Sequence, residues 1–269
     1  VDAALMFHDI AGSPVKEGTV GVFGPGAVYA SSGRFEIHIK GVGGHGAAPD
    51  WTHNPLGAMC AIYQGIHEIV AEHRSPFDSC TMTVGKMSAG DSANIIPETA
   101  IMQGTIRTFS KQVGERLRKD LVTLVEYVGK AKGVTAEVTF GTACPPLVVD
   151  SNVHKSFLCS MKEMFGDEAW DMRTAWGGAY SKSTSAEDFS YIAEKVPSGF
   201  GWIFLGDSRQ GRKWGCHNPK VQFNDAYLYR GAAAYTKAAM DWLLENAAAG
   251  TVSDCIRQAE ETLYEMAGN

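Results

Sequence analysis

The alternation of polar and apolar residues predicts a β-strand at residues 34–40, where every second side chain is apolar. Residues 110–132 instead carry an apolar stripe at helical spacing that ends at Gly133, as expected of an amphipathic helix with a glycine C-cap. The remaining members of this series are a helix that begins at Asn54-Pro55 and strands at 80–87, 99–109 and 134–140. The order β-α-β-β-α-β is that of a split βαβ, ferredoxin-like sandwich. It predicts one inserted domain at residues 32–142.

The flanking segments, residues 1–31 and 143–269, follow a different pattern. Residues 201–206 form a continuous apolar run, which is typical of a strand in a sheet covered on both faces. The other predicted elements are strands ending at His8 and at 19–23, 147–149 and 170–176, and helices from about 151, after 185–189, and from Asn224 to about 247. A last helical stripe lies in a tail that starts at about residue 251. The two flanking segments are therefore expected to form one α/β domain around the insert.

Charge and cysteine content narrow the choice of partners and compartment. The 269 residues carry a net charge of -6, which leaves no basic surplus for a nucleic acid backbone. No apolar run is long enough to span a bilayer, and no signal-type segment opens the chain. The six scattered cysteines lack a C-x-x-C pair and predict free thiols in a reducing cytoplasm. The chain opens at Val1 within a strand-like segment, so we expect a longer protein shortened at its N-terminus.

The loop Gly43-Gly44-His45-Gly46 sets a histidine among three glycines, directly after the strand at 34–40. Glycine lets a backbone approach closely and take left-handed angles, so this loop can present an imidazole at the surface. Imidazole donates hydrogen bonds to developing anions and changes charge near neutral pH. The residues alone leave two interpretations open, a tight turn with an incidental histidine or a catalytic group.

Two further histidines, His8 and His217, each follow an apolar strand of the flanking segments. Strand ends are where α/β sheets usually place ligands, and neutral imidazole suits zinc and other first-row ions. We expect Cys216 to point away from this site, because it is the immediate neighbour of His217 along the chain. Two histidines do not complete a metal site, and a hydrogen-bonded core histidine is an equal alternative for His8.

Asn94, on a loop, and Arg107, on the strand that follows it, are candidates for binding a substrate carboxylate. The guanidinium group offers a two-pronged fork that matches a carboxylate. The alternative for Arg107 is an ordinary surface salt bridge.

Five motifs occur in a fixed order along the chain: Gly43-Gly44-His45-Gly46-Ala47-Ala48-Pro49 with Asn54-Pro55, Asn94-Ile95-Ile96-Pro97, Gly104-Thr105-Ile106-Arg107-Thr108-Phe109, Ser185-Ala186-Glu187-Asp188-Phe189, and His217-Asn218-Pro219 with Phe223-Asn224-Asp225. In order and spacing they resemble the M20 metallopeptidase family. The closest resemblance is to its amidohydrolase branch of hippurate hydrolases, N-acyl-amino-acid deacylases and auxin-conjugate hydrolases. It covers residues 1 to about 246. Each motif is weak alone, but five in order are specific.

The resemblance implies a catalytic α/β domain with two divalent ions, zinc or manganese, and an inserted lid domain through which a homodimer forms. It also implies hydrolysis of the amide bond of an N-acyl or N-aroyl amino acid. By the same resemblance, His8 and His217 match metal ligands. His45 matches the lid histidine that polarises the scissile carbonyl, which in many members belongs to the partner subunit's site. Asn94 and Arg107 match residues that hold the substrate carboxylate, and Glu187 lies in a segment that lines the pocket near the metals. For that last segment, helix capping is the alternative.

One departure from the family pattern bears on activity. The Cys/His/Asp metal motifs and the Glu-Glu pair that includes the general base lie upstream of the His8 strand in the family and have no counterpart here. We therefore expect an incomplete C-terminal part that does not turn over by itself. Two alternatives are a catalytically inactive binding or assembly protein and one subunit of a heteromeric hydrolase. Asp50 and Asn54 stand where the branch often has His and Asp, which leaves the substrate preference open.

Overall fold

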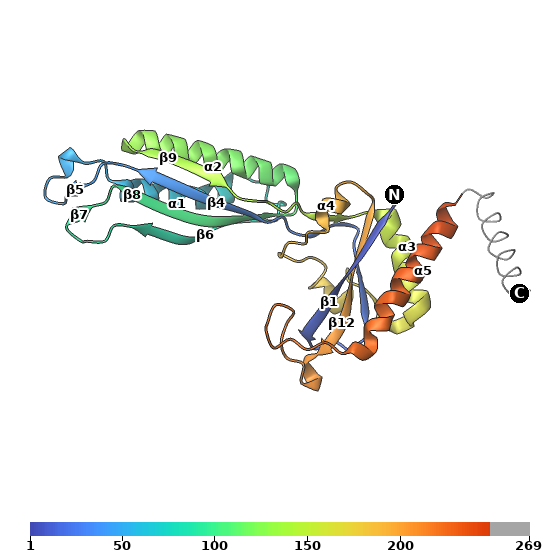
Figure 1. The fold of residues 1–269 in the computed structure, drawn as a ribbon. Helices are drawn as coiled ribbons and strands as arrows, with labels where there is room; N and C mark the ends of the chain where they lie inside the picture. Colours follow the sequence, from blue (N-terminus) through green and yellow to red (C-terminus); the bar gives the residue numbers. More distant parts are fainter. Residues whose placement is uncertain (248–269) are drawn as a thin grey trace, which may run out of the picture. The chain divides into compact units, whose positions relative to one another are not determined.

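The computed structural model describes residues 1–247, which form two compact units. The first unit contains Val1–Gly26, Val149–Ser181 and the chain from Val196 onward, and the second, here called the inserted unit, contains Ala27–Val148 and Lys182–Lys195. Figure 1 traces both units along the chain. The helical tail predicted from about residue 251 lies outside the described residues.

A four-stranded antiparallel sheet with two helices on one face forms the body of the inserted unit (Figure 1). The strand order is β6-β8-β4-β9. The elements are β4 (Gly33–Lys40), α1 (Pro55–Glu72), β6 (Cys80–Ala89), β8 (Thr99–Thr108), α2 (Lys111–Lys132) and β9 (Thr135–Phe140). Their order is β-α-β-β-α-β, so the predicted ferredoxin-like arrangement is confirmed.

The core of this unit follows from the alternation in β4 and the stripe on α2. Phe35, Ile37 and Ile39 are buried beneath the helices, whereas their polar neighbours in β4 face the other side of the sheet. Leu117 and Leu121 of α2 are fully buried against them. One face of the sheet is therefore an apolar core, and the opposite face is polar.

Local capping sets the ends of both helices as the sequence predicts. The Asn54 side-chain oxygen accepts a hydrogen bond from the Leu56 backbone nitrogen at 3.0 Å, and Ser110 Oγ accepts one from the Val113 nitrogen at 3.4 Å. Gly133 ends α2 with a left-handed φ of 68°, a conformation that glycine adopts without strain. Asn54 is thus explained as a helix cap.

The inserted unit extends beyond the predicted limits of residues 32–142. Strand β3 (Gly26–Tyr29) pairs with β10 (Leu147–Val149), and residues 182–195, which were predicted to lie in the flanking α/β domain, group with the inserted unit. The physical reason is backbone pairing: the Ala30 nitrogen donates to the Ser183 carbonyl at 2.9 Å, and the Ser183 nitrogen donates to the Val28 carbonyl at 2.7 Å. The same segment carries the four-residue helix α4 (Ser190–Ala193).

The first unit is built on a second four-stranded sheet with the order β1-β12-β2-β11. Its elements are β1 (Ala4–Ser13), β2 (Val20–Phe23), α3 (Ser151–Phe165), the 3-10 turn η2 (Gly166–Glu168), β11 (Ala169–Asp171), the 3-10 turn η3 (Ala175–Gly178), β12 (Ser198–Asp207), the 3-10 turns η4 (Ser208–Gln210) and η5 (Asp225–Tyr227), and α5 (Leu228–Asn246). β1 runs parallel to β12, and β12 runs antiparallel to β2. Helices α3 and α5 cover one face, where Phe157 and Met161 meet Val20, Ile203 and Leu205.

Two predicted elements of this half of the chain are shorter than expected. The strand predicted at 170–176 ends at Asp171, because the backbone turns there: the Asp171 carboxylate accepts from the Arg173 nitrogen at 3.0 Å, and the Asp171 carbonyl accepts from the Thr174 nitrogen at 3.1 Å. Trp176, Gly177 and Gly178 then have left-handed φ angles that no strand accommodates. The helix predicted after 185–189 is only the four-residue α4. Serines and acids at 183–188 suggested the start of this helix, but they do not determine its length.

A buried carboxylate, Glu17, ties the loop between β12 and α5 to the sheet of the first unit. Its two oxygens accept hydrogen bonds from the Asp207 nitrogen at 3.1 Å, Arg212 Nη1 at 2.8 Å and Asn224 Nδ2 at 2.5 Å. The glutamate side chain is 3% exposed, so an ion at this position needs these donors to offset its loss of hydration. Both ends of the 207–224 loop are fixed by this one side chain.

We expect Leu121→Ala to lower the free energy of unfolding of the inserted unit by about 2–5 kcal/mol, because it opens a cavity in a fully buried part of the core. Chemical denaturation followed by circular dichroism measures the change. Tyr127→Ala on the same helix is the control, since Tyr127 is 65% exposed and its loss removes little buried area. Equal effects of the two substitutions would contradict the assignment of the core.

We expect Glu17→Ala to destabilise the first unit by about 3–5 kcal/mol, because it leaves Arg212 and Asn224 without their buried acceptor. Backbone amides of residues 207–224 should exchange with deuterium much faster in the variant. Glu163→Ala is the control, because its ion pair with Lys237 involves a carboxylate that is 61% exposed, and such pairs contribute less than about 1 kcal/mol. Unchanged exchange in the loop would show that Glu17 does not anchor it.

Candidate functional site

The structure brings the segments that carry His8 and His217 together beside the middle of β1. The prediction that this strand ends at His8 is wrong, because its pairing with β12 continues to Ser13. The Asp9 carbonyl oxygen accepts hydrogen bonds from His8 Nδ1 at 2.8 Å and from Cys216 Sγ at 3.1 Å. One backbone oxygen thus links the residue after His8 to the residue before His217. The sequence could not reveal this contact, because His8 and His217 are far apart along the chain and their segments meet only in the folded structure.

The position of Cys216 differs from the sequence prediction. Its thiol points toward β1 and bonds to Asp9, whereas we expected it to point elsewhere. A second contact explains the approach: a Cβ on Gly12 would lie 2.7 Å from the Gly215 nitrogen and 2.8 Å from the Trp214 carbonyl carbon. Gly12 also has a φ of 78°. Only glycine lets the 214–216 backbone lie this close to β1.

The hydrogen bond of His8 fixes which of its ring nitrogens is available. A carbonyl oxygen only accepts, so Nδ1 must carry the proton, and Nε2 keeps its lone pair. An Nδ1–H bonded to a backbone carbonyl is the usual support of a metal-ligating histidine. Desolvation at this point of β1 raises the pKa of Asp9, and the neighbouring His8 lowers it by a smaller amount.

The donor set here fits part of a metal site. His8 offers Nε2, and His217 is exposed on the loop that Cys216 anchors. Within residues 1–247, no group of three or more His, Cys, Asp or Glu side chains is arranged to hold a metal ion. The two imidazoles are therefore suited to be ligands in a set that needs further donors.

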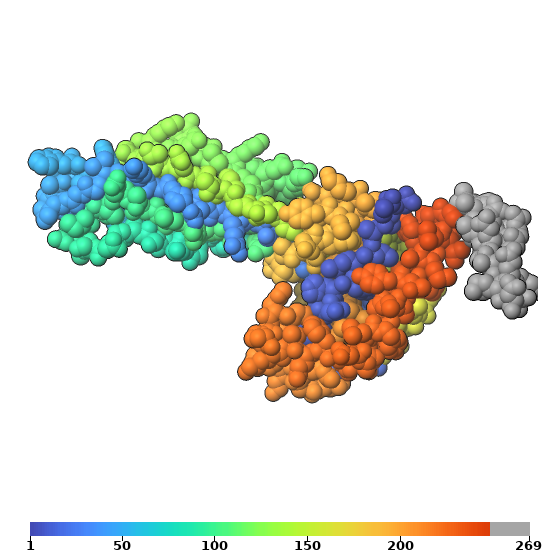
Figure 2. Space-filling model, viewed as in Figure 1, coloured from blue at the N-terminus to red at the C-terminus, as the bar shows by residue number. Residues whose placement is uncertain are grey.

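His45 and Asn94 lie side by side at one end of the inserted unit, although they are far apart in sequence. Strand β5 (Gly44–His45) pairs antiparallel with β7 (Ile95–Ile96), with His45 opposite Ile95, and the Gly46 nitrogen donates to the Asn94 carbonyl at 2.8 Å. Figure 2 shows the segments around residues 45 and 95 together at this end. We call the β5–β7 ribbon and its loops the tip.

Hydrogen bonds at the tip orient both polar side chains. His45 Nδ1 accepts from the Ala47 nitrogen at 3.1 Å, so the ring proton is on Nε2, which is left as an outward donor. The Asn94 side-chain oxygen accepts from Ser92 Oγ at 2.7 Å, which leaves the Asn94 amide N–H groups to donate. The tip therefore presents hydrogen-bond donors, as stabilisation of an oxyanion requires.

The glycines around His45 serve close packing rather than left-handed backbone angles. Gly43, Gly44 and Gly46 are absent from the residues with positive φ. A Cβ on Gly46 would lie 3.1 Å from the Asn94 oxygen, and one on Gly43 would lie 2.9 Å from the Ile96 oxygen. The prediction that glycine is needed here holds for its small size, because larger residues would push the two strands of the tip apart.

Arg107 lies at the opposite end of the inserted unit from the tip. β8 has ten residues, and the tip adjoins its beginning while Arg107 is next to last. At about 3.3 Å per residue the strand is roughly 30 Å long. Asn94 and Arg107 of a single chain are therefore too far apart to bind one carboxylate. Their predicted role in binding the substrate carboxylate stays a prediction. The salt bridge considered for Arg107 is also absent from the described residues.

Glu187 is buried, with 7% of its surface exposed. Its carboxylate accepts from the Phe189 nitrogen at 3.3 Å, and its carbonyl accepts from Cys144 Sγ at 3.3 Å. The bond to the Phe189 nitrogen closes a local turn ahead of α4, whose N-cap residue, Phe189, has no side-chain cap. A role for Glu187 in binding substrate stays a prediction.

Sequence reasoning missed two residues that support these positions. Glu17 holds the loop that carries His217, and its only sequence signal is an acid in a Gly-rich segment. His154 is 4% exposed, and its Nδ1 donates to the Phe23 carbonyl at 2.9 Å. Burial lowers the pKa of His154. It is a core histidine rather than a ligand.

Comparison with known proteins agrees with this arrangement. The family model described as peptidase dimerisation domain, M20_dimer, matches residues 30–132. An Arabidopsis thaliana protein named IAA-amino acid hydrolase ILR1-like 2 is 31% identical over 85% of this chain and 51% of its own length. An N-acetylcysteine deacetylase of Bacillus subtilis is 30% identical over 85% of this chain and 56% of its own length. The chain spans about half the length of the curated relatives it matches.

Solved structures show the same fold. A Bacillus subtilis protein described as a dinuclear metal binding peptidase from the M20 family has a TM-score of 0.67 and 24% identity, over 91% of this chain and 58% of its own. The structure of AtUAH in complex with (S)-hydroxyglycine has a TM-score of 0.60 and 19% identity, over 90% of this chain and 54% of its own. Residues 30–132 therefore match the dimerisation domain of the M20 peptidases, and the chain as a whole is similar to hydrolases and deacetylases and shares the fold of an M20 peptidase.

Proposed function

We propose that this protein is part of a metal-dependent amidohydrolase that cleaves the amide bond of N-acyl or N-aroyl amino acids. The observation that carries the proposal is the Asp9 carbonyl in β1, which joins His8 and the Cys216-His217 segment. The names of the relatives, an amino acid conjugate hydrolase and N-acetyl deacetylases, support the same reaction class.

We infer that His8 and His217 are two ligands of a divalent metal centre. When bound, zinc or manganese would supply Lewis acidity and a water activated at neutral pH. The described residues contribute the aromatic nitrogens: His8 presents Nε2 because Nδ1 is held by Asp9, and the Glu17 and Cys216 contacts hold the His217 loop against the sheet. The remaining ligands and the general base are not among the side chains assembled here.

The tip supplies the other half of the chemistry. Attack on an amide carbonyl places negative charge on its oxygen, and a fixed N–H donor at hydrogen-bond distance lowers the barrier. His45 can donate from Nε2 because its Nδ1 is occupied by the Ala47 nitrogen. We propose that His45 stabilises this oxyanion and that the Asn94 amide donates beside it.

A second copy of the chain follows from the length of the inserted unit. The tip and Arg107 lie about one strand length apart, roughly 30 Å, and an N-acyl amino acid is much shorter than that. If both contact one substrate, they belong to different chains. The match to a dimerisation domain over residues 30–132 supports a homodimer formed through the inserted unit.

Two other functions remain as alternatives, an inactive binding or assembly protein and one subunit of a heteromeric hydrolase. Either protein would keep the fold. A measurement of metal binding distinguishes part of an active enzyme from a chain that has lost its chemistry.

For the cellular compartment, we propose the cytoplasm, based on the free cysteines among the described residues. No helix of the described residues is long and apolar enough to cross a membrane.

We expect the chain to bind Zn²⁺ through His8 and His217, and His8→Ala and His217→Ala should each weaken binding at least tenfold. Competition with a chromophoric chelator measures the affinity. His67→Ala is the control, because His67 lies on α1 in the inserted unit. Equal affinity of all four proteins would rule out these ligands.

The chain alone is expected not to hydrolyse N-acyl amino acids, because it lacks the remaining metal ligands and the general base. Substantial turnover would contradict this expectation.

In an enzyme with a complete metal centre, we expect His45→Ala to lower kcat by about 10²–10³ and to leave the metal content unchanged, because it removes one oxyanion donor. Steady-state kinetics and metal analysis of the purified variant test this. His38→Ala is a suitable control, since His38 is an exposed histidine of β4 that pairs with Glu36. Loss of metal, or an unchanged rate, would contradict the assigned role.

A further inference from the structure

A groove with apolar walls lies between α3 and α5 of the first unit and reaches the start of β1. Its volume is about 380 Å³. One wall is a single face of α5, because Tyr235, Ala238 and Trp242 recur there at helical spacing. Val153 and Phe157 of α3 form the opposite wall. A groove of this composition favours a partner with apolar side chains.

The α5 wall of this groove is held in place, but the described residues do not cover it. Tyr235 Oη accepts a hydrogen bond from the Phe7 nitrogen at 2.8 Å, and the two rings meet edge to face with their centroids 5.3 Å apart. Tyr235 is nevertheless 40% exposed, and Leu243 at the end of the wall is 64% exposed. A preformed apolar surface can be covered without a prior rearrangement, which favours binding.

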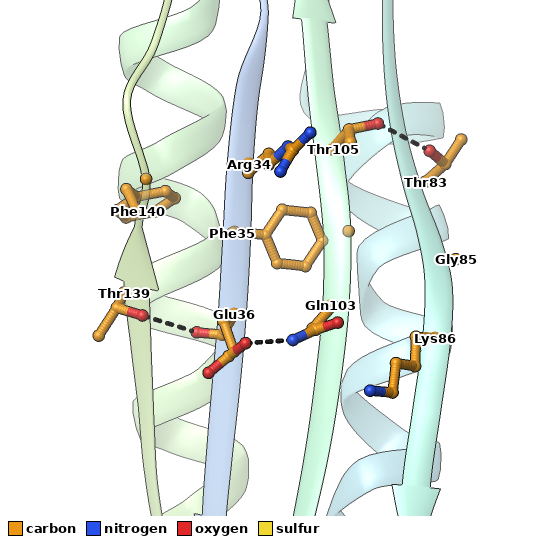
Figure 3. Close-up of a pocket in the computed structure, with 12 residues that line it drawn as sticks. Arg34, Phe35, Glu36, Thr83, Gly85, Lys86, Gln103, Thr105, Thr139 and Phe140 are labelled. Carbon is orange, nitrogen blue, oxygen red and sulfur yellow. Dashed lines mark hydrogen bonds between the residues drawn. The ribbon is translucent and has the colours of Figure 1, made fainter.

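A larger hollow on the polar face of the inserted sheet differs in this respect. Its volume is about 720 Å³, and several of its side chains already bind one another (Figure 3). Glu36 accepts a hydrogen bond from Gln103, and the hydroxyl oxygens of Thr83 and Thr105 are 3.2 Å apart. These polar groups have partners within the sheet, whereas Leu243 of the α5 wall stays open to water.

The chain continues from the end of α5 into residues 248–269, and the sequence of this segment is complementary to the groove. Its apolar residues recur at helical spacing, at Ile256, Ala259, Leu263 and Met266. This stripe predicts an amphipathic helix over residues 253–267. A single helix of about 15 residues is marginal in water, so it needs an apolar surface against which to pack. The α5 wall is such a surface within the same chain.

The spacing along the chain allows this helix to fold back on the groove. α5 ends at Asn246, and residues 247–252 can span roughly 20 Å when extended. From Tyr235 to Leu243 the α5 wall rises about 12 Å, and the stripe of the predicted helix rises about 15 Å. An antiparallel return along α5, as in an αα-hairpin, therefore brings the stripe over the whole length of the wall.

Tethering favours this segment over the same segment of a second copy. A short linker gives an attached partner an effective concentration in the millimolar range. That value exceeds the concentration of free copies in a micromolar solution by about a thousandfold. A groove that both could fill is therefore filled mainly from within the chain.

We propose that residues 253–267 dock as a helix in the groove between α3 and α5, with Leu263 facing Trp242 and Leu243. The docked segment adds a third helix to the layer that α3 and α5 form on the sheet of the first unit. This contact goes beyond the proposed function, because it needs neither the metal centre nor the tip.

Hydrogen–deuterium exchange of the full chain tests this docking, with a synthetic peptide of residues 248–269 as the reference for the undocked segment. We expect the amides of residues 256–266 to exchange at least about tenfold more slowly in the chain than in the peptide. Leu263→Asp and Leu243→Asp should each raise the exchange to the rate of the peptide, because either substitution places a charge in the apolar contact.

Tyr264→Asp and Leu244→Asp are the matched controls. Tyr264 lies off the apolar stripe, and Leu244 is 54% exposed and is not part of the groove lining. Both control variants should keep the protection of the wild type within about twofold.

Other outcomes would overturn the docking. Equal exchange in the wild-type chain and in the peptide would show that the segment does not dock. Protection that is lost on dilution of the chain would show that the groove takes the segment of a second copy. Protection that Leu263→Asp removes and Leu243→Asp retains would place the segment on another surface. Zn²⁺ binding through His8 and His217 is measured separately, so none of these results decides the metal centre.

Discussion

The arrangement of the first unit depends on a negative charge buried beneath a polar loop. Residues 207–224 contain a single short 3-10 turn, η4, and a segment of this kind has little regular structure to hold it in place. Glu17 compensates by accepting from donors near both ends of the loop. The bond between Cys216 and the Asp9 carbonyl then fixes its centre. His217 owes its position to these polar contacts rather than to a core.

In the inserted unit, hydrogen-bond donors are held at the end of a sheet. Its body is held by apolar packing under α1 and α2, so the strands are rigid along their length. The tip has almost no core of its own and is held by the ribbon of β5 and β7. Small residues at positions 43 and 46 permit the close approach of these strands. Rigid strands and a narrow ribbon together give His45 a defined position without burying it.

Much of this fold could be predicted from the sequence because its signals are local. Alternation in β4, the stripe on α2 and the caps Asn54 and Gly133 each depend on neighbouring residues, and the structure has them as expected. What failed depends on contacts between distant segments. Residues 182–195 belong to the inserted unit through backbone bonds to Val28 and Ala30, and no pattern within the segment indicates this.

The candidate site shows the same division between local and distant contacts. The residue types were recognisable: a histidine among glycines, two histidines in the flanking segments, an arginine in a strand. Their grouping was not, since it depends on register and on the length of β8. His45 and Asn94 come together across a ribbon of two-residue strands, which are too short to produce a pattern. The same ten-residue strand separates Arg107 from Asn94.

The length of β8 fixes the distance between the tip and Arg107 within the inserted unit. A strand can be lengthened only in steps of about 3.3 Å, and an odd number of added residues would turn Arg107 toward the helices. Paired strands must also change together to keep the sheet intact. The distance between the tip and Arg107 can therefore change only in steps of two residues, about 6.6 Å each, if Arg107 is to keep its face of the sheet. Smaller changes in this distance must come from side chains and loops, while the sheet keeps its span.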